Sequence, residues 1–284
     1  MTPHRSSRAA CALLTILLTL APASLCVNND DGGAVTISTL EQIKQDFDSV
    51  PCKKNEERLS AVRLLFEKMG ASSSDITSQK IGRVENLLIR KQGSGDGLIV
   101  IGAHYDKTSD GCGAIDNWSG VVTVAHLYRS LLKRTLKKSV LFVAFGREEE
   151  GLVGSKAMVK AIDKEAAGQY CAMINIDSLG MGAPQVATNL STKKISDRAA
   201  ELAKRLGMTF AAGTLERADA DSSSFLAKKI PAITIHALVS DWPKILHSSK
   251  DQASMVKPES VYLGYRLALS LAVDLDNAAC DAWR

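Results

Sequence analysis

Seven residues of this 284-residue sequence have side chains that could together support metal-dependent chemistry: His104, Asp106, Asp116, Glu148, Glu149, Asp177 and His247. Histidine nitrogen and carboxylate oxygen are ligands that suit zinc. The cysteines and serines stand in no motif typical of a catalytic nucleophile. The residue types therefore favour a metal-activated water over a covalent intermediate.

A pair of zinc ions fits the charges of these residues. One carboxylate that bridges two ions would hold them about 3.5–4 Å apart, which is the usual spacing of two-metal catalytic sites. Two zinc ions bring four positive charges, which Asp116, Glu149, Asp177 and a bridging hydroxide would balance. Such a neutral site is tolerable in a partly buried crevice. Asp106 follows His104 closely enough to orient the histidine ring.

Each of these residues also has a simpler interpretation. Asp116 could be the N-cap of a helix, and residues 148–150 could form a solvated acidic turn at a helix start. Asp177 could pair with a lysine, and His247 alone is typical of a surface histidine. The positions of the surrounding elements decide between these interpretations and a shared site.

Three apolar runs predict buried strands that end close to these side chains. The strands at residues 98–103, 139–145 and 171–177 end at or just before His104, Glu148 and Asp177. Open α/β sheets place their sites at the carboxyl ends of such strands. We therefore expect the acids and histidines to meet at one edge of one sheet.

The remaining pattern alternates strands with helices. Further strands are predicted at residues 85–90 and 230–236, and helices at 40–47, 55–69, 121–132, 155–162, 196–206 and 258–275. No internal repeat or linker interrupts the chain. This alternation predicts a single α/β domain with a mainly parallel sheet.

The first residues have the pattern of a secretory signal peptide. Basic residues between 4 and 8 precede an apolar segment at 9–20, which is too short to span a membrane, and small residues follow. We expect residues 1–26 to be the signal peptide and cleavage region, 27–37 a flexible tail and 38–284 the catalytic domain. The protein is therefore predicted to be secreted or periplasmic.

Export permits disulfide bonds. Four cysteines lie beyond residue 26: Cys52, Cys112, Cys171 and Cys280. A bridge to Cys112 would brace the segment between His104 and Asp116, and Cys52 is its predicted partner. Cys171 opens a predicted strand, where a buried free thiol is at least as good an interpretation as a disulfide.

The composition limits the kinds of molecule that the protein is expected to bind. Apolar residues make up 45% of the chain, which is enough for a sizeable core. The formal charge is only +4, and the basic residues form no stripe with aromatic ones, so nucleic acid is not an expected partner. Oligomeric state is left open, with a monomer expected.

Five motifs resemble the secreted di-zinc aminopeptidases related to bacterial leucyl aminopeptidase, a family that also contains the glutaminyl cyclases. The motifs are Gly102-Ala-His-Tyr-Asp106, Gly113-Ala-Ile-Asp-Asn-Trp-Ser-Gly120, Phe145-Gly-Arg-Glu-Glu-Glu-Gly-Leu-Val-Gly-Ser155, Asn175-Ile-Asp-Ser-Leu-Gly180 and His247-Ser-Ser-Lys-Asp251. They follow the order of the family between about residues 85 and 275.

The resemblance implies a role for each site residue. His104 and Asp177 would bind one zinc, Glu149 and His247 the other, and Asp116 would bridge them. Glu148 would be the general base. The resemblance also implies a three-layer αβα domain with a mixed, mostly parallel sheet of about eight strands between helices, and a cis peptide after Asp116.

Two departures from the family pattern concern substrate binding. A family segment of the type Ser-Asp-His-x-x-Phe appears here as residues 220–225, with Asp221 but without the histidine. Leu246 stands before His247, where many relatives have an aromatic residue. These changes affect substrate recognition and oxyanion stabilisation rather than the metal ligands.

The sequence thus predicts an exported aminopeptidase that removes N-terminal residues from peptides with a free N-terminus. A zinc acyltransferase similar to glutaminyl cyclase is the first alternative. It usually lacks the acidic run followed by Gly-Leu-x-Gly-Ser that is present at residues 148–155. A catalytically inactive binding protein on the same fold is the second alternative, and the intact Glu148 argues against it.

Overall fold

The computed structural model describes residues 33–284, so the predicted signal peptide lies outside the described residues. An eight-stranded mixed sheet crosses the domain in the order β1-β2-β4-β3-β5-β8-β6-β7. Its strands are β1 (Ile76–Ile81), β2 (Val84–Lys91), β3 (Leu98–His104), β4 (Ser139–Phe145), β5 (Tyr170–Ile176), β6 (Gln185–Ala187), β7 (Ala211–Gly213) and β8 (Ala232–His236).

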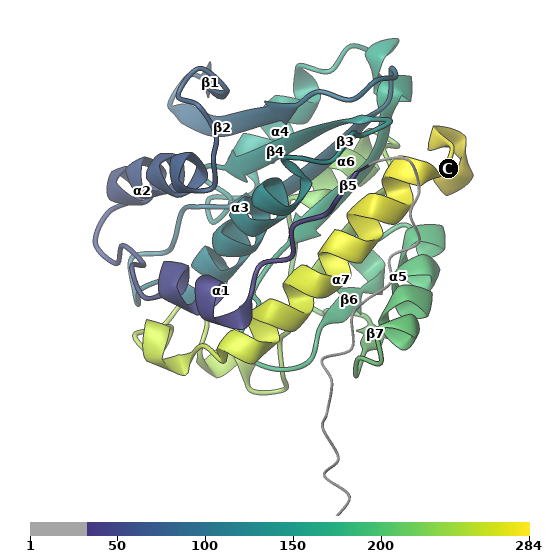
Figure 1. The fold of residues 1–284 in the computed structure, drawn as a ribbon. Helices are drawn as coiled ribbons and strands as arrows, with labels where there is room; N and C mark the ends of the chain where they lie inside the picture. The colour runs from purple at the N-terminus through teal and green to yellow at the C-terminus, as the bar shows by residue number, and fades with distance from the viewer. Residues whose placement is uncertain (1–32) are drawn as a thin grey trace, which may run out of the picture. The chain divides into compact units, whose positions relative to one another are not determined.

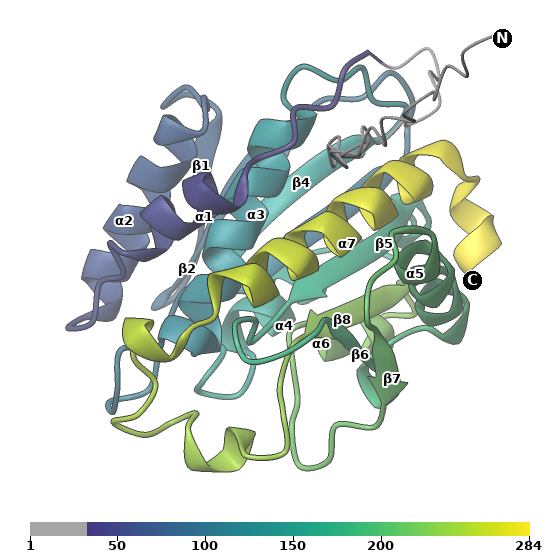
Figure 2. The ribbon, with the colours of Figure 1, turned by 60° about the horizontal axis from the view of Figure 1, so that its bottom comes forward.

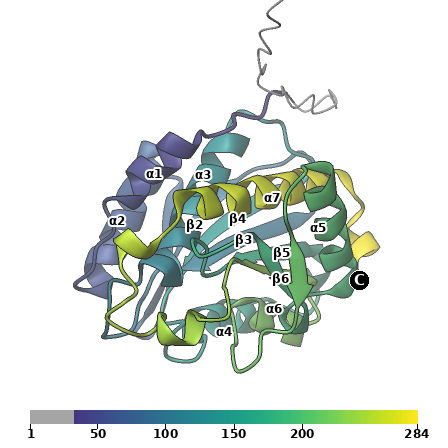
Figure 3. The same cartoon turned by 90° about the horizontal axis from the view of Figure 1, so that it is seen from below.

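Helices cover both faces of this sheet (Figure 1). Viewed from below, α1, α3, α5 and α7 lie on one face, and α4 and α6 lie on the other (Figure 3). The helices are α1 (Leu40–Phe47), α2 (Asn55–Lys68), α3 (Ser119–Leu131), α4 (Val153–Lys160), α5 (Lys193–Arg205), α6 (Ser222–Ala227) and α7 (Pro258–Asn277). The predicted three-layer α/β domain is confirmed. Within residues 33–284, no helix is both long and apolar enough to cross a membrane.

The centre of the sheet is parallel and the flanks are partly antiparallel. Strands β4, β3, β5 and β8 are parallel neighbours, whereas β2 pairs antiparallel with β4 and β6 pairs antiparallel with β8. Every residue of β3 is buried, because helices cover both of its faces. The carboxyl ends of the four central strands therefore share one edge of the sheet.

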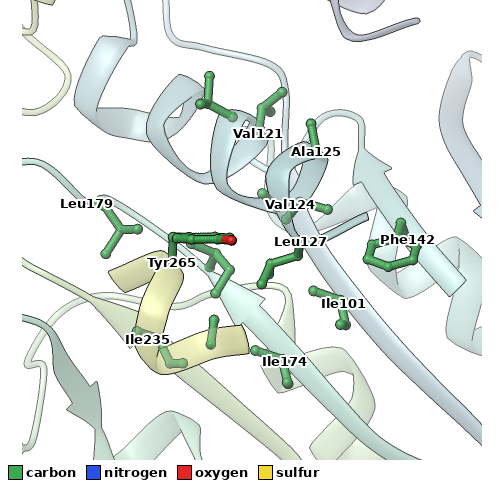
Figure 4. Packing of buried hydrophobic residues seen from close by; sticks show 14 of the residues in the cluster. Ile101, Val121, Val124, Ala125, Leu127, Phe142, Ile174, Leu179, Ile235 and Tyr265 are labelled. Carbon is green, nitrogen blue, oxygen red and sulfur yellow. The ribbon is translucent and has the colours of Figure 1, made fainter. Parts of the chain in front are cut away.

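The larger core lies between the sheet and the layer formed by α3 and α7. Val124 and Leu127 of α3 lie on the side of the helix that faces Ile101 of β3 and Ile174 of β5 (Figure 4). Burying a side chain of this size stabilises the fold by about 1.5–3 kcal/mol relative to leaving it exposed. The core fixes the strands whose ends deliver the site residues.

Several elements have no clear signal in the sequence. For β1, β6, β7 and the six-residue helix α6, the sequence predicts neither a strand nor a helix. β1 and β7 form the two edges of the sheet, and β6 lies beside β7 (Figure 2). Two of these strands have only three residues, which is too short for a hydrophobic period to be recognised. All of them lie on the flanks of the sheet or on its α4 face, away from the α3 and α7 layer.

Two disulfides lie in the described part of the chain. Cys52 pairs with Cys112, as predicted, and so joins the segment before α2 to the loop that follows β3. Cys171 pairs with Cys280, so the interpretation of Cys171 as a free thiol is wrong. The local pattern around Cys171 could not reveal this bridge, because its partner is 109 residues further along the chain.

Candidate metal centre

The ends of the parallel strands bring the predicted acids and histidines together. His104 is the last residue of β3, Asp177 follows β5, and the Glu148–Glu149 pair follows β4. Since β3 lies between β4 and β5, all of these side chains start from adjacent strand ends. His247 comes from the loop before α7, and it reaches the same edge of the sheet from outside.

Asp116 lies between the two histidines. One of its carboxylate oxygens is 3.0 Å from Nε2 of His104, and the other is 3.0 Å from Nε2 of His247. His247 Nε2 is also 3.0 Å from a carboxylate oxygen of Glu149. His104 Nε2 lies 3.7 Å from Asp177 and 3.9 Å from Glu148. A single carboxylate is thus shared by two histidine–acid groups.

The spacing of the predicted ligand atoms suits zinc. Donor atoms about 2.0–2.1 Å from a tetrahedral zinc ion lie roughly 3.3 Å from one another. The histidine–carboxylate separations around Asp116, 3.0–3.7 Å, are close to that spacing. A buried oxygen of Glu149 has no hydrogen-bond partner within residues 33–284, which leaves it free to bind a cation.

The backbone around Asp116 is held by a second acid. Asp251 accepts hydrogen bonds from the N–H groups of Ala114, Ile115 and Asp116, at 2.9, 2.7 and 3.1 Å. The predicted cis peptide joins Asp116 to Asn117. The hydrogen bonds to Asp251 fix the backbone from which the Asp116 side chain projects.

Asn117 is part of the same support. Its side chain donates to the Ile176 carbonyl and accepts from the N–H groups of Gly120 and Ser178. Asn117 is fully buried, so the glycosylation sequon at this position cannot be used in the folded protein. A Cβ atom on Gly120 would lie 2.3 Å from the side-chain amide oxygen of Asn117, which explains why this helix start requires glycine.

Asp106 contacts the backbone of Glu148 and Glu149 more closely than it contacts the ring of His104. Its carboxylate accepts the backbone N–H groups of Glu148 and Glu149, at 3.0 and 3.2 Å. The same carboxylate is 3.7 Å from Nδ1 of His104, whereas the Asp106 backbone carbonyl is closer, at 3.2 Å. Asp106 therefore couples the end of β3 to the loop after β4.

Arg58 is a buried cation behind the site that the sequence pattern did not single out. It donates to the backbone carbonyls of Tyr105, Cys112 and Gly113. It also lies over the ring of Trp118, 5.3 Å from its centroid. Burial lowers the pKa of Arg58 to about 10, against the opposing influence of nearby acids. Because Arg58 lies on helix α2, only the tertiary fold reveals this role.

The cluster contains more acids than cationic partners, and this excess raises the pKa values of several of its side chains. Burial raises the pKa of both Glu148 and Glu149, and neighbouring carboxylates add to the rise. Hydrogen bonds to Asp116 and Glu149 raise the pKa of His247 to about 10. Burial by itself would lower the pKa of His104. The charge of Glu148 and the hydrogen bonds to the other acids outweigh burial, so the pKa of His104 is raised. The cluster thus attracts protons, and it would attract metal cations for the same reason.

Asp221 is a second residue that the sequence did not assign to the site. It is fully buried at the start of α6, and neither carboxylate oxygen accepts a hydrogen bond from the described residues. Burial raises the pKa of Asp221 to about 7, and the charge of Asp177 adds to the rise. The sequence departure at residues 220–225 directed attention to Asp221, but its burial depends on the unpredicted helix α6.

A cavity of about 270 Å³ opens above the cluster. The acids and histidines form one part of its wall, including His236, whose pKa burial lowers to about 4. Another part is apolar and consists of Leu190, Leu215, Leu238, Trp242 and Leu246. The cavity therefore combines a strongly acidic surface with an apolar one, a pattern suited to a small ligand with one charged end.

An α/β sheet with histidines and carboxylates gathered at its central strand ends defines a protein of the zinc-exopeptidase fold class. Residues 86–271 match the model of peptidase family M28. The chain belongs to this family.

The named relatives include peptidases and a cyclase. Leucine aminopeptidase 1 of Metarhizium robertsii is 26% identical over 175 residues, which cover 49% of this chain and 42% of that protein. The structure of LapB from Legionella pneumophila gives a TM-score of 0.71 at 20% identity, with 84% of this chain and 72% of that chain covered. A glutaminyl cyclase of an Acidobacteriales bacterium gives 0.74 at 16% identity, with 91% and 99% covered. The match to the curated relative spans less than half of that relative's length.

Proposed function

We propose that this protein is an exported zinc aminopeptidase that removes residues from the N-terminus of peptides. The observation that supports this most directly is the position of Asp116, with one oxygen 3.0 Å from His104 and the other 3.0 Å from His247. A carboxylate in this position suits a bridge between two zinc ions. Membership of family M28 and the leucine aminopeptidase among its relatives support a peptidase.

Each histidine would hold one ion with one acid. His104 and Asp177 would hold the first zinc, His247 and Glu149 the second, and Asp116 would contact both. When bound, the two ions would lower the pKa of a shared water and polarise the carbonyl group of the peptide. Asp106 and Asp251 would keep the ligands in place through the backbone N–H groups that they accept.

Glu148 is the best candidate for the general base. Glu149 faces His247 at 3.0 Å and Glu150 binds Arg147, whereas the Glu148 carboxylate makes no hydrogen bond within residues 33–284. Its raised pKa favours proton uptake. In this role, Glu148 would accept the proton of the attacking water and pass it to the amine of the leaving peptide.

The cavity accounts for recognition of the chain end. Its acids complement a free N-terminal ammonium group, and its apolar wall can receive the first side chain. Acetylation of the N-terminus should therefore abolish cleavage of an otherwise identical peptide. Equal rates on the free and acetylated peptides would contradict the assignment as an aminopeptidase.

Metal content tests the proposal directly. The purified protein should contain about two zinc ions per chain and lose its activity to a chelator. Asp116→Ala should lose both ions, because Asp116 faces both histidine–acid groups. Asp110→Ala, an exposed acid in the same loop, is the matched control and should keep both. Full zinc content in Asp116→Ala would overturn the bridging assignment.

Export has a separate test. Expression of the full chain in a host with a secretion pathway should yield an exported protein whose N-terminus begins between residues 21 and 27. Retention of the intact N-terminus inside the cell would contradict the assignment of residues 1–26 as a signal peptide.

A glutaminyl cyclase activity is the second candidate, because the structure with the TM-score of 0.74 is a glutaminyl cyclase. That reaction would close an N-terminal glutamine into a ring and release ammonia. A peptide that begins with glutamine distinguishes the two activities: the aminopeptidase releases free glutamine, whereas the cyclase leaves a peptide that is lighter by one ammonia.

A further inference from the structure

A groove between α4 and α6 begins where the cavity of the candidate metal centre ends. The groove has a volume of about 320 Å³. It shares Leu152, Lys156 and Asp219 with the wall of the cavity. The two helices pack against each other on the face of the sheet opposite α7 (Figure 3). A chain that leaves the cavity on this side would enter the groove directly.

The groove is basic. Lys156 and Lys160 lie one turn apart on α4, and Lys228 follows the end of α6. Lys160 and Lys228 make no ion pair or side-chain hydrogen bond within the described residues. Lys156 donates one hydrogen bond, of 3.0 Å, to the carbonyl of Gly151, which leaves two of its three N–H groups for another acceptor.

The acid in the groove does not neutralise these lysines. The Asp219 carboxylate accepts hydrogen bonds from the Ala220 N–H and the Ser223 hydroxyl, and it forms no ion pair with a described lysine. Between the charged groups, Leu152 and Val159 form an apolar floor. The groove thus combines an apolar surface with unpaired positive charge.

We propose that this groove holds the part of the substrate beyond the cleaved bond and that its lysines favour peptides with carboxylates there. The proposal rests on the proposed aminopeptidase function, because that function places the N-terminal residue at the acidic cluster. The rest of the peptide must then leave the cavity. The acidic cavity attracts the ammonium end, and the basic groove attracts acidic side chains further along the same peptide.

The spacing of the lysines indicates where the acids should be. Lys156 and Lys160 are four positions apart, which is about 6 Å along the axis of α4. An extended peptide covers about 3.3 Å per residue, so this distance corresponds to about two residues. Acidic side chains at alternate positions of the substrate should therefore meet the two lysines best.

The test uses peptides that differ only in charge. The amidated peptides Leu-Gly-Glu-Gly-Glu, Leu-Gly-Gln-Gly-Gln and Leu-Gly-Lys-Gly-Lys are compared by kcat/KM, with leucine 4-nitroanilide as a reporter that has no downstream chain. Exposed ion pairs contribute up to about fivefold each. The acidic peptide, which has two carboxylates, should therefore be cleaved about 2- to 25-fold faster than the neutral one. Leu-Gly-Gly with a free or an amidated end shows whether the chain-end carboxylate acts in the same way.

A double variant with a matched control assigns the effect to the groove. Lys160→Glu combined with Lys228→Glu should remove the preference for the acidic peptide and increase cleavage of the lysine peptide. Lys44→Glu combined with Lys204→Glu changes the net charge equally on exposed residues of α1 and α5, on the opposite face, and should keep the native preference. The native preference should also weaken as salt screens the charges.

The outcomes separate this proposal from the proposed function. Cleavage of all peptides at similar rates, or the same change in both double variants, overturns the groove assignment and leaves the aminopeptidase intact. Failure to release leucine from the peptides or the reporter, in protein that contains zinc, overturns the aminopeptidase function and the groove assignment with it.

Discussion

Two buried histidines of this protein each have a carboxylate at 3.0 Å, but they lie in very different surroundings. His126 of α3 contacts Asp46 of α1, and His104 of β3 contacts Asp116. Both histidine side chains are at most 1% exposed. The contact distance alone gives no reason to treat the two pairs differently.

The network around His126 is balanced. Ser38 contacts Nδ1 of the ring at 2.8 Å, and Lys68 pairs with the other oxygen of Asp46. Tyr265 of α7 joins the network through the Ser38 N–H. One acid of α1, one lysine of α2 and one histidine of α3 thus satisfy each other, so this network stabilises the fold.

The cluster around His104 is not balanced. Asp116, Glu148 and Asp177 all lie within 4 Å of one nitrogen of its ring. The cluster also opens to a cavity of about 270 Å³, and one oxygen of Glu149 has no partner in the described part of the chain. The difference shows that an excess of buried acid, rather than a histidine–acid contact, distinguishes a site from a structural network.

The largest effect should come from removing the proposed base. Glu148→Gln keeps the size of the side chain but cannot accept a proton, so kcat should fall by about 10²–10⁴-fold while zinc content is unchanged. Steady-state kinetics and metal analysis on the same preparation measure both quantities. Glu150→Gln, an exposed neighbour that pairs with Arg147, is the control and should remain active. If Glu148→Gln loses zinc while Glu149→Ala retains both ions, the roles of the two glutamates are exchanged.

A substitution in the balanced network should lower the free energy of unfolding and leave the zinc content unchanged. His126→Leu leaves Asp46 buried without its histidine partner, so the free energy of unfolding should fall by about 1–3 kcal/mol. Zinc content should not change, because His126 lies outside the cluster. Glu149→Ala should do the opposite, with loss of zinc from one site and little loss of stability in the metal-free protein. Denaturant unfolding and metal analysis of both variants measure these effects. Loss of zinc in His126→Leu, or a large loss of stability in metal-free Glu149→Ala, would contradict the comparison.

Zinc binding should release protons from the unbalanced cluster. The pKa of His247 is about 10 in the metal-free protein, so its ring carries a proton at pH 7 that a metal ion must displace. The apparent affinity should therefore rise with pH below about 10, by about tenfold per unit for each proton released. Calorimetry in two buffers of different ionisation enthalpy measures the protons released. Equal heats in the two buffers would show that His247 is not a ligand.

Much of the fold could be predicted from the sequence, because the central strands and α3 have long apolar runs. The site residues could be grouped because His104, Glu148 and Asp177 follow such strands directly. The roles of Arg58 and Asp221 could not be predicted. Arg58 lies in an amphipathic helix where an arginine is typical of the surface, and Asp221 is buried only because the short helix α6 packs beside β8.

The smallest effect should come from Lys68, the exposed member of the balanced network. Its side chain is 60% exposed, so its ion pair with Asp46 should contribute less than about 1 kcal/mol to the free energy of unfolding. Burial alone would raise the pKa of Asp46, but the hydrogen bonds to His126 and Lys68 outweigh it and lower the pKa below 3.8. This stabilisation is therefore present above pH 3.8 and is lost as the pH falls further, when Asp46 takes up a proton.

Lys68→Gln should be slightly less stable than the native protein at pH 7, and the difference should shrink at low pH and in high salt. Denaturant unfolding across this pH range, with Lys204→Gln as the exposed control, measures the difference. A loss larger than that of His126→Leu would show that Lys68, rather than the histidine, dominates the balanced network.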